Sequence, residues 1–327
     1  MVKTIGKYLL KFVLLMFAVS IVVFFLVGVS PIDPVQANVG QTAYASLSAE
    51  QKEALAQYWG SNLPIWERYV NWLGSALQGD LGTSLRFNLP VAEVLATRAG
   101  NTLLLMLVAW IFSGAIGLTL GVVAGYNKGR APDAAIKGIC FVLASTPAFW
   151  FGLVMLIVFA VWLGWFPIGF SVPIGKTADE VTIFDTLYHL VLPALTLSIV
   201  GIGNIALHTR EKTIDVLESE YVRFAQARGS SRFQALTQHG LRNLVLPAIT
   251  LQFAAISEIF GGSVLVEQVF SYPGLGQAAV TAGTGGDAAL LVGIAIVSAL
   301  IVFCGNTVAD ILYRIIDPRL KKRGDAA

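Results

Sequence analysis

Two features of the chain have the residue types and spacing for a functional role. One is a carboxylate, Glu258, which lies about halfway along the apolar run Leu244–Val266. A carboxylate at the middle of a membrane costs roughly 3 kcal/mol on insertion scales, so we expect it to face either a cavity or a partner group. The other is Glu220–Pro247, a polar stretch rich in arginine between two apolar runs. A basic segment in this position is suited to contacting a partner outside the membrane.

Motifs for catalysis and cofactor binding are absent from the sequence. There is no GxxxxGK[ST] phosphate loop, no HExxH pair and no GxSxG element. We therefore expect no enzyme activity, no catalytic residue, no metal and no cofactor in this chain. Nucleic-acid binding is also not expected, because the basic stretch carries several acidic residues and is tethered at the membrane. The histidines and cysteines are scattered: His189, His208, His239, Cys140 and Cys304.

Composition points to an integral membrane protein. Of 327 residues, 56% are hydrophobic and only 13% are charged, whereas soluble domains carry about 25% charged residues. Six runs are long and apolar enough to cross a hydrocarbon core of about 30 Å. Spanning segments must be helical, because lipid offers the backbone no hydrogen-bond partners. We predict an all-α, polytopic fold with spans near Phe12–Val29, Thr102–Gly125, Gly138–Phe166, Leu190–Leu207, Leu244–Val266 and Ala288–Ile316.

The positions of lysine and arginine predict the orientation. Cytoplasmic segments are enriched in these residues, and an internal N-terminus divides the 22 of them 17 to 5. Both termini are then expected inside, in a multi-pass protein of the cytoplasmic membrane. The five on the outside are Lys52, Arg68, Arg86, Arg98 and Lys176.

This topology divides the chain into three parts. Residues 1–30 form an N-terminal transmembrane helix, 31–100 an external segment, and 101–327 a five-helix core with a cytoplasmic loop at 208–247. In the external segment, Ser48–Trp72 has helical spacing, with Ser48 as a candidate N-cap. Its aromatic residues suit either the membrane interface or a docking surface.

Local signals within Glu220–Pro247 predict two short helices. Gly229 follows Arg228 where a left-handed C-cap glycine would lie. Ser231 and Gln234 have the spacing of a capping box at the start of a second helix. Pro247 is expected at the beginning of the next apolar run, where its missing N–H costs little.

Small residues and proline mark two further elements in the spans. Gly117, Gly121 and Gly125 recur every four residues, which favours close packing with another helix. Ser145-Thr146-Pro147 should bend the third span, because proline removes one backbone hydrogen bond. Ser145 and Pro147 are therefore candidates, with Glu258, for a pathway through the membrane, although ordinary bending explains the kink equally well.

The polar stretch resembles the cytoplasmic "EAA" loop of permease subunits of ABC importers. Its form is similar to the dipeptide, oligopeptide and nickel branch, in the residues Tyr221-Val222-Arg223, Ala225, Ala227, Arg228, Gly229, His239, Leu241-Arg242-Asn243 and Leu246-Pro247. Further matches to the first, B-type, permease run through the whole chain: Pro31-Ile32-Asp33-Pro34, Gly79-Asp80-Leu81-Gly82, Asn101-Thr102-Leu103, Pro147-Ala148-Phe149-Trp150, Phe270 through Gly276 and Asp317-Pro318-Arg319.

Three positions depart from the pattern of this family. Arg223-Phe224-Ala225 replaces Glu-Ala-Ala, and Gly283–Asp287 replaces a charged external stretch. Glu258 lies where relatives have an uncharged residue.

The resemblance implies an ATP-driven importer of peptides or related small solutes, nickel chelates included. It implies four kinds of partner in a bacterial inner membrane: a C-type permease, two ATPase subunits that bind ATP and Mg, an external solute-binding protein, and lipid. ATPase coupling would fall to Tyr221, Val222, Arg223, Phe224, Ala225, Ala227, Arg228 and Gly229, and binding-protein docking to Tyr272, Pro273, Gly274 and Asp287. The alternative from the residues is a self-contained secondary transporter or channel.

Overall fold

The computed structural model describes residues 2–58 and 63–316. Within these ranges every regular element is helical, and the only β pairing is an isolated bridge between Thr83 and Pro90. The motif Asp317-Pro318-Arg319 lies outside the described residues, as do the side chains of His239 and Arg242. Contacts divide the chain into two units, Met1–Thr102 with Pro273–Phe303, and Leu103–Tyr272 with Cys304–Ala327. This division differs from the expected one, because residues 273–303 join the N-terminal part.

Unit 1 contains the N-terminal helix and the segment expected outside the membrane. Its helices are α1 (Val2–Val29), α2 (Pro34–Val39), α3 (Gln41–Ser46), α4 (Ala49–Tyr58), α5 (Ile65–Leu77), α14 (Leu275–Thr284) and the first parts of α6 (Val91–Tyr126) and α15 (Ala288–Ile316). Ser48 is an N-cap as predicted: its Oγ accepts from the Gln51 N–H, while Gln51 Oε1 accepts from the Ser48 N–H.

Two of the external aromatic residues form part of the core of unit 1. Tyr69 is buried, and its hydroxyl lies 3.0 Å from Ser20 Oγ on α1. The rings of Tyr69 and Trp72 lie 5.4 and 6.0 Å from Phe24, centroid to centroid. These two side chains therefore hold α5 against α1. The sequence suggested the membrane interface or a docking surface for these aromatic residues; Tyr69 is buried against α1, so it offers no surface to a docking protein.

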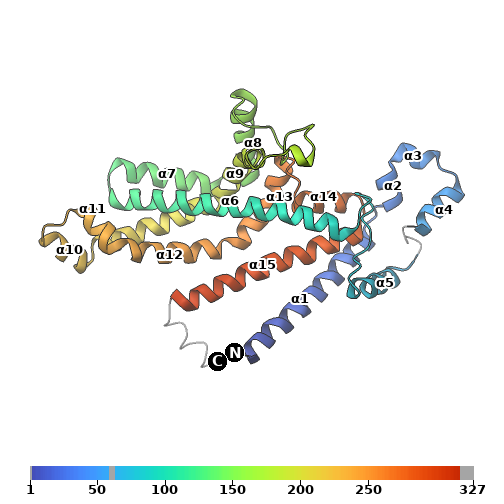
Figure 1. Cartoon of the computed structure of the whole chain (residues 1–327), viewed down its shortest axis with the longest axis horizontal. Coiled ribbons are helices and arrows are strands. Elements are labelled where there is room, and N and C mark those ends of the chain that lie inside the picture. The colour runs from blue at the N-terminus through green and yellow to red at the C-terminus, as the bar shows by residue number, and fades with distance from the viewer. Residues whose placement is uncertain (1, 59–62, 317–327) are drawn as a thin grey trace. The chain divides into compact units, whose positions relative to one another are not determined.

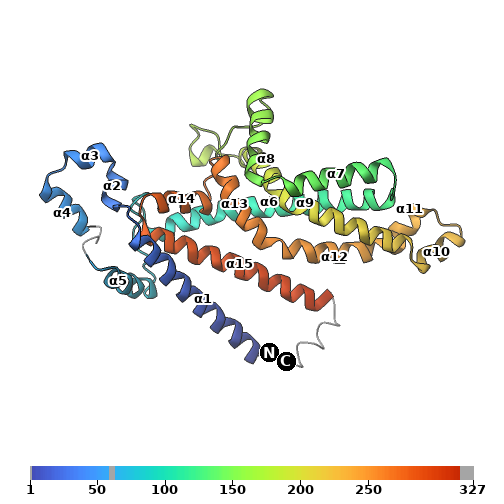
Figure 2. The ribbon, with the colours of Figure 1, turned by 180° about the vertical axis from the view of Figure 1, so that it is seen from behind.

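Unit 2 is a bundle around α9 (Ile183–Leu217). Its other elements are α7 (Ala131–Ser145), α8 (Ala148–Met155) with the π-helical η1 (Leu156–Trp162), the short 3₁₀ turn η2 (Ala178–Glu180), α10 (Glu220–Ala227), α11 (Arg232–Ala235), the π-helical η3 (Leu236–Gly240), α12 (Leu241–Ala254) and α13 (Ile256–Val269). Helices α6, α7, α9 and α12 run side by side, with α10 and α11 at one end of them (Figures 1 and 2). Most of the apolar part of α9 is buried inside the unit.

The six expected spans correspond to four straight helices and two bent pairs. α1, α6, α9 and α15 are each long and apolar enough to cross a membrane. The third and fifth expected spans are broken, α7 with α8–η1 at 108° and α12 with α13 at 52°. α6 and α9 have 36 and 35 residues, about 54 and 52 Å at 1.5 Å per residue, so each is longer than the hydrocarbon core is thick.

The predicted bend at Ser145-Thr146-Pro147 is sharper than a proline kink. Thr146 and Pro147 both have extended backbone angles, with ψ of 124° and 135°. A residue before proline is pushed out of the helical region by the proline ring, so two consecutive residues leave the helix. The result is a change of direction between two helices.

The glycine spacing in α6 produces the predicted close packing. A Cβ added at Gly121 would lie 2.5 Å from Thr209 Cβ and 2.6 Å from the Ala206 carbonyl oxygen on α9. At Gly125 the corresponding distances are 2.5 Å to Thr213 Cβ and 2.7 Å to the Arg210 carbonyl oxygen. Any side chain here would force α6 and α9 apart.

We predict that Gly121→Val lowers the thermal stability of the purified protein, while Gly138→Val does not. Overpacking a close contact costs typically 1–3 kcal/mol, whereas nothing lies within 4 Å of a Cβ at Gly138 on α7. Thermal unfolding in detergent measures both variants against wild type. Equal stability of the two variants would contradict the packing described for α6 and α9.

Candidate functional site

The polar stretch begins with α10, whose C-terminal end has the predicted glycine cap. Gly229 has φ +95°, a left-handed conformation that residues other than glycine rarely adopt. Its N–H donates to the Gln226 carbonyl at 2.9 Å, and the Ser230 N–H donates to the Ala225 carbonyl at 3.1 Å. These two bonds form a Schellman motif. The helix therefore ends at a fixed point, and the chain turns back towards the bundle.

The second predicted helix is the start of a much longer one. The capping box is present: Gln234 N–H donates to Ser231 Oγ at 3.2 Å, and Ser231 N–H donates to Gln234 Oε1 at 3.0 Å. However, α11 continues through η3 into α12 without a turn. Pro247 lies inside α12, so its predicted place at a helix start was wrong. The helix begins before the apolar run does, because the capping box starts it in the polar segment.

Helix α10 has one face buried in unit 2 and one face exposed. Val222 is fully buried and Ala225 is 8% exposed. They belong to a cluster whose other buried members come from α9, α11, η3 and α12: Val216, Leu217, Ala235, Leu236 and Leu244. Two of the eight residues expected to couple to an ATPase therefore point inwards and fix α10 to the bundle.

The outward face of α10 presents aromatic and basic side chains. Phe224 is 64% exposed and Tyr221 is 42% exposed, although both are large and apolar. Arg228 stands over the Phe224 ring at 5.9 Å, and Arg223, Ala227 and Gly229 are exposed too. We call Tyr221, Arg223, Phe224, Ala227, Arg228 and Gly229 the outer face of α10.

A shallow cavity borders this face. Its volume is about 680 Å³, and its lining includes Tyr221, Phe224, Arg228 and Asn243. Asn243 Nδ2 on α12 donates to the Tyr221 hydroxyl at 3.0 Å. This bond ties the outer face directly to the start of α12.

An ion pair holds α7 and α9 together near α10. Arg210 Nε donates to Asp133 Oδ1 at 2.6 Å, and its Nη2 donates to Oδ2 at 2.8 Å. The Asp133 side chain is 1% exposed and also accepts from the Gly129 N–H. Breaking a buried, bidentate pair of this kind costs about 3–5 kcal/mol. Sequence reasoning missed Asp133, because nothing in the local sequence relates it to an arginine 77 residues later.

The pathway candidates lie at the two helix breaks. Ser145 and Pro147 are exposed at the bend between α7 and α8. Glu258 is exposed in the first turn of α13, three residues after Ala255, where α12 ends. The structure thus places all three at bends, but no described contact joins Glu258 to Ser145 or Pro147.

The break between α12 and α13 is held on both sides within unit 2. Before it, the side chain of Gln252 donates to the Trp110 carbonyl and to Ser113 Oγ on α6, and Trp110 Nε1 donates back to the Gln252 carbonyl at 2.9 Å. After it, Ser257 Oγ lies 2.9 Å from Asn306 Oδ1 on α15. Gln252 is a second residue that sequence reasoning missed, since a lone glutamine in an apolar run gives no signal of its partners.

The three docking candidates in the turn before α14 are buried or half-buried. Tyr272 is fully buried, and burial together with the nearby Glu267 carboxylate raises the pKa of its hydroxyl well above the usual value. Gly274 is buried as well, and Pro273 is half-buried with its carbonyl accepting from Asn101 Nδ2 at 2.8 Å. These residues shape the turn before α14 and offer little surface to a partner.

Asp287 is the fourth docking candidate that the structure corrects. It is fully buried, and both of its oxygens are occupied. Oδ1 accepts from the Leu290 N–H at 3.1 Å, which caps α15, and Oδ2 accepts from Ser84 Oγ at 2.7 Å and the Arg86 N–H at 3.2 Å. Asp287 therefore anchors the loop of residues 83–90 and does not face solvent as expected.

Metal binding was not expected, and the described residues contain no group of three or more His, Cys, Asp or Glu side chains arranged to hold a metal ion.

Comparison with known proteins gives a match over almost the whole chain. Residues 117–322 match the family described as "binding-protein-dependent transport system inner membrane component". The oligopeptide transport system permease protein AppB of Bacillus subtilis (strain 168) is 37% identical over 308 residues, 94% of this chain and 95% of the relative. The di/tripeptide permease protein DppB of Pseudomonas aeruginosa (strain UCBPP-PA14) is 32% identical over 93% of this chain and 94% of its own length.

The glutathione transport system permease protein GsiC of Escherichia coli (strain K12) is 32% identical over 321 residues, 98% of this chain and 99% of the relative. The shared length covers the bundle, the two helix breaks and the outer face of α10. The chain belongs to the family of inner membrane components of binding-protein-dependent transport systems, as a transmembrane subunit of an ABC importer.

Proposed function

We propose that this chain is the B-type permease of a peptide importer. It would pair with a C-type permease, receive its solute from an external binding protein, and be driven by two ATPase subunits. The relatives named for oligopeptides, di- and tripeptides, and glutathione support the peptide class. No catalysis is assigned to this chain, since ATP hydrolysis belongs to the ATPase partners. A self-contained secondary transporter is not retained, because the family depends on a binding protein.

The outer face of α10 is the observation that carries the coupling role. A membrane protein that exposes Phe224 and Tyr221 on a short polar helix outside its spans has an unsatisfied apolar surface there. Arginines on the same face add charge that suits a polar groove. We assign this face to the contact with an ATPase subunit, with Phe224 as the central side chain.

Force applied to α10 would reach the membrane through two helices. Val222 and Ala225 are packed against residues from both α9 and α12, and Asn243 bonds to Tyr221. α9 continues for 35 residues and is the most buried span. A rigid helix moves as a unit when one end is displaced, which is the basis of domain rocking. α9 and α12 would therefore act as the two levers of the transport cycle.

Both termini are assigned to the cytoplasm, on the 17 to 5 division of lysine and arginine. Contacts within unit 2 agree with this topology. Lys128 and Glu218, from two segments expected inside, form an ion pair at 2.6 Å. Arg232, from the same loop as Glu218, stands over the ring of Tyr126, which lies close to Lys128 in the sequence, at 5.1 Å. The two loops assigned to the same side thus meet at one end of the bundle.

Glu258 is assigned to the transport pathway shared with the C-type permease. Its side chain is exposed within a broken span, and a carboxylate in hydrocarbon needs water or a partner. On this assignment it favours cationic solutes over neutral ones.

The topology predicts which engineered cysteines react from outside the cell. In a chain whose Cys140 and Cys304 are replaced by alanine, an impermeant maleimide should label Ser75→Cys on α5 in intact spheroplasts. Ala227→Cys on α10 should react only after permeabilisation. Both positions are exposed, so accessibility of the side chain is matched. Labelling of Ala227→Cys from outside would reverse the assignment.

Phe224→Ala should weaken binding of the ATPase subunit to the permease, because it removes the central apolar contact. A hot-spot aromatic contributes about 2 kcal/mol or more, so the affinity should fall roughly thirtyfold. Phe233→Ala is the matched control: Phe233 is 62% exposed in the same loop but lies on α11. We expect it to retain near wild-type affinity in a titration of the ATPase against permease in nanodiscs. An equal loss in both variants would argue against a contact centred on α10.

Glu258→Gln should change which peptides are transported. A carboxylate lining a water-filled pathway attracts a cationic solute about 4 Å away by about 1 kcal/mol, roughly fivefold. The ratio of lysine-containing to neutral peptide uptake should therefore fall about fivefold, whereas Glu258→Asp should keep it. Uptake in proteoliposomes, over a panel that also includes glutathione and nickel chelates, measures this. A uniform fall for all solutes would instead indicate a structural contact with the second permease.

A further inference from the structure

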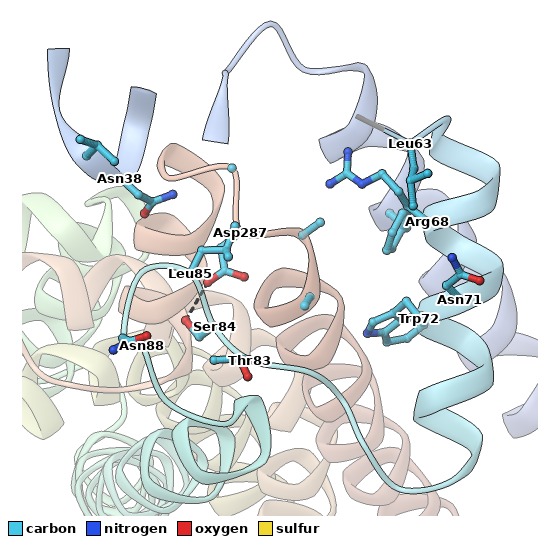
Figure 3. Close-up of a pocket in the computed structure, with 15 residues that line it drawn as sticks. Asn38, Leu63, Arg68, Asn71, Trp72, Thr83, Ser84, Leu85, Asn88 and Asp287 are labelled. Carbon is cyan, nitrogen blue, oxygen red and sulfur yellow. Dashed lines mark hydrogen bonds between the residues drawn. The ribbon is translucent and has the colours of Figure 1, made fainter. Parts of the chain in front are cut away.

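Unit 1 contains a cavity of about 700 Å³ whose lining includes one cationic side chain, Arg68, and one carboxylate, Asp287. Its wall is built from five places in the chain: α1, the end of α2, α5, the loop of residues 83–90 and the start of α15. Arg68 and Trp72 extend from α5 towards the side where Ser84 and Asp287 lie (Figure 3). We call this space the Arg68 cavity.

The walls of the Arg68 cavity are fixed by contacts that do not involve Arg68. Asp287 holds the loop through Ser84 and the Arg86 N–H, as described above. Trp72 Nε1 donates to the Leu81 carbonyl at 3.3 Å, and its ring packs near Phe24. Asn38 Nδ2 donates to the Gly285 carbonyl at 2.8 Å. A ligand would therefore meet a preformed site and would not have to order the loop itself.

Arg68 is partly buried without a compensating acid. None of the ion pairs among the described residues includes Arg68. Burial lowers the pKa of its guanidinium, which is the signature of a cation that has lost water and gained no anion. The one carboxylate in the wall, Asp287, already accepts three hydrogen bonds. Arg68 stays charged at neutral pH, so an anion entering the cavity would gain a charge-assisted contact.

The chemistry of the wall selects a carboxylate. A guanidinium offers two parallel N–H groups that match the two oxygens of a carboxylate. Asn71 and Asn88, both exposed, add amide groups from opposite sides of the cavity. The cavity is much larger than one carboxylate, so it accommodates an acidic side chain together with part of the segment that carries it.

We propose that the Arg68 cavity receives an acidic side chain of the external binding protein. This rests on the proposed topology, which places residues 31–100 outside. Within unit 1 the cavity lies at the ends of the membrane helices, where α1 finishes and α15 begins, and a binding protein approaches from that side. The charge complementarity of Arg68 is the argument for an acidic contact. The docking role expected for Asp287 is thus assigned to the Arg68 cavity, because Asp287 itself is buried and holds the loop that forms part of the cavity wall.

The test measures the affinity of the binding protein for the complete transporter in nanodiscs. Arg68→Gln should weaken binding tenfold or more. Arg68→Lys should weaken it less, because lysine keeps the positive charge but lacks the two parallel N–H groups of the guanidinium. Arg86→Gln is the matched control, since Arg86 is an exposed arginine of the loop of residues 83–90 and its side chain does not line the cavity. Binding to Arg68→Gln that equals binding to Arg86→Gln would overturn the proposal.

A double-mutant cycle identifies the partner and removes dependence on the folding of one variant. Each exposed Asp or Glu on the docking face of the binding protein is changed to its amide. One of these changes should weaken wild-type binding tenfold but leave binding to Arg68→Gln unchanged. Additive losses for every acid would contradict a direct contact.

Titration of glutarate into the complex without binding protein tests the other source of a carboxylate. Arg68-dependent glutarate binding, with unchanged binding-protein affinity in Arg68→Gln, would assign the cavity to a free small acid and overturn the docking role. The Ser75→Cys labelling distinguishes a failure of the docking site from a failure of the topology. If Ser75→Cys is labelled from outside and the binding protein binds Arg68→Gln normally, only the docking site is rejected. If Ser75→Cys is not labelled from outside, the topology is rejected.

Discussion

The burial of Val222 and Ala225 makes α10 part of the membrane bundle. A helix of 8 residues is too short to be stable alone in water, so its position depends on the two small apolar side chains that enter the cluster formed by α9, α11, η3 and α12. The Schellman motif at Gly229 and the capping box at Ser231 then return the chain to the bundle within a few residues. These inward contacts fix the orientation of α10, so that its exposed side chains, Phe224 above all, face away from the bundle.

The same mode of construction recurs within unit 1. Asp287 is buried to fix the loop of residues 83–90, and this leaves Arg68 as the unpaired charge of the cavity that the loop borders. At α10 and at the loop of residues 83–90, buried residues fix the conformation of the segment. A neighbouring exposed or half-exposed residue is then available to contact a partner. A permease that is driven by one protein and supplied by another requires two such surfaces.

Local signals in the sequence predicted those features that depend on neighbouring residues. Capping at Ser48, Gly229 and Ser231, and the glycine face of α6, depend on spacings of a few residues, so they could be recognised directly. Hydropathy located the spans but not their ends, because α9 continues about ten residues past the apolar run. The 108° bend exceeded expectation because two residues, Thr146 and Pro147, leave the helix together.

Burial of polar residues could not be predicted from the sequence, because it depends on partners far along the chain. Asp287 and Tyr272 looked like exposed turn residues, yet both are fully buried.

The most direct test of the coupling role of α10 is photo-crosslinking from this helix in the assembled transporter. A benzophenone amino acid at position 224 should crosslink to the ATPase subunit, and the same group at position 233 should not. Crosslinks from position 233 alone, or none from position 224, would contradict the assignment of the outer face of α10 as the coupling contact.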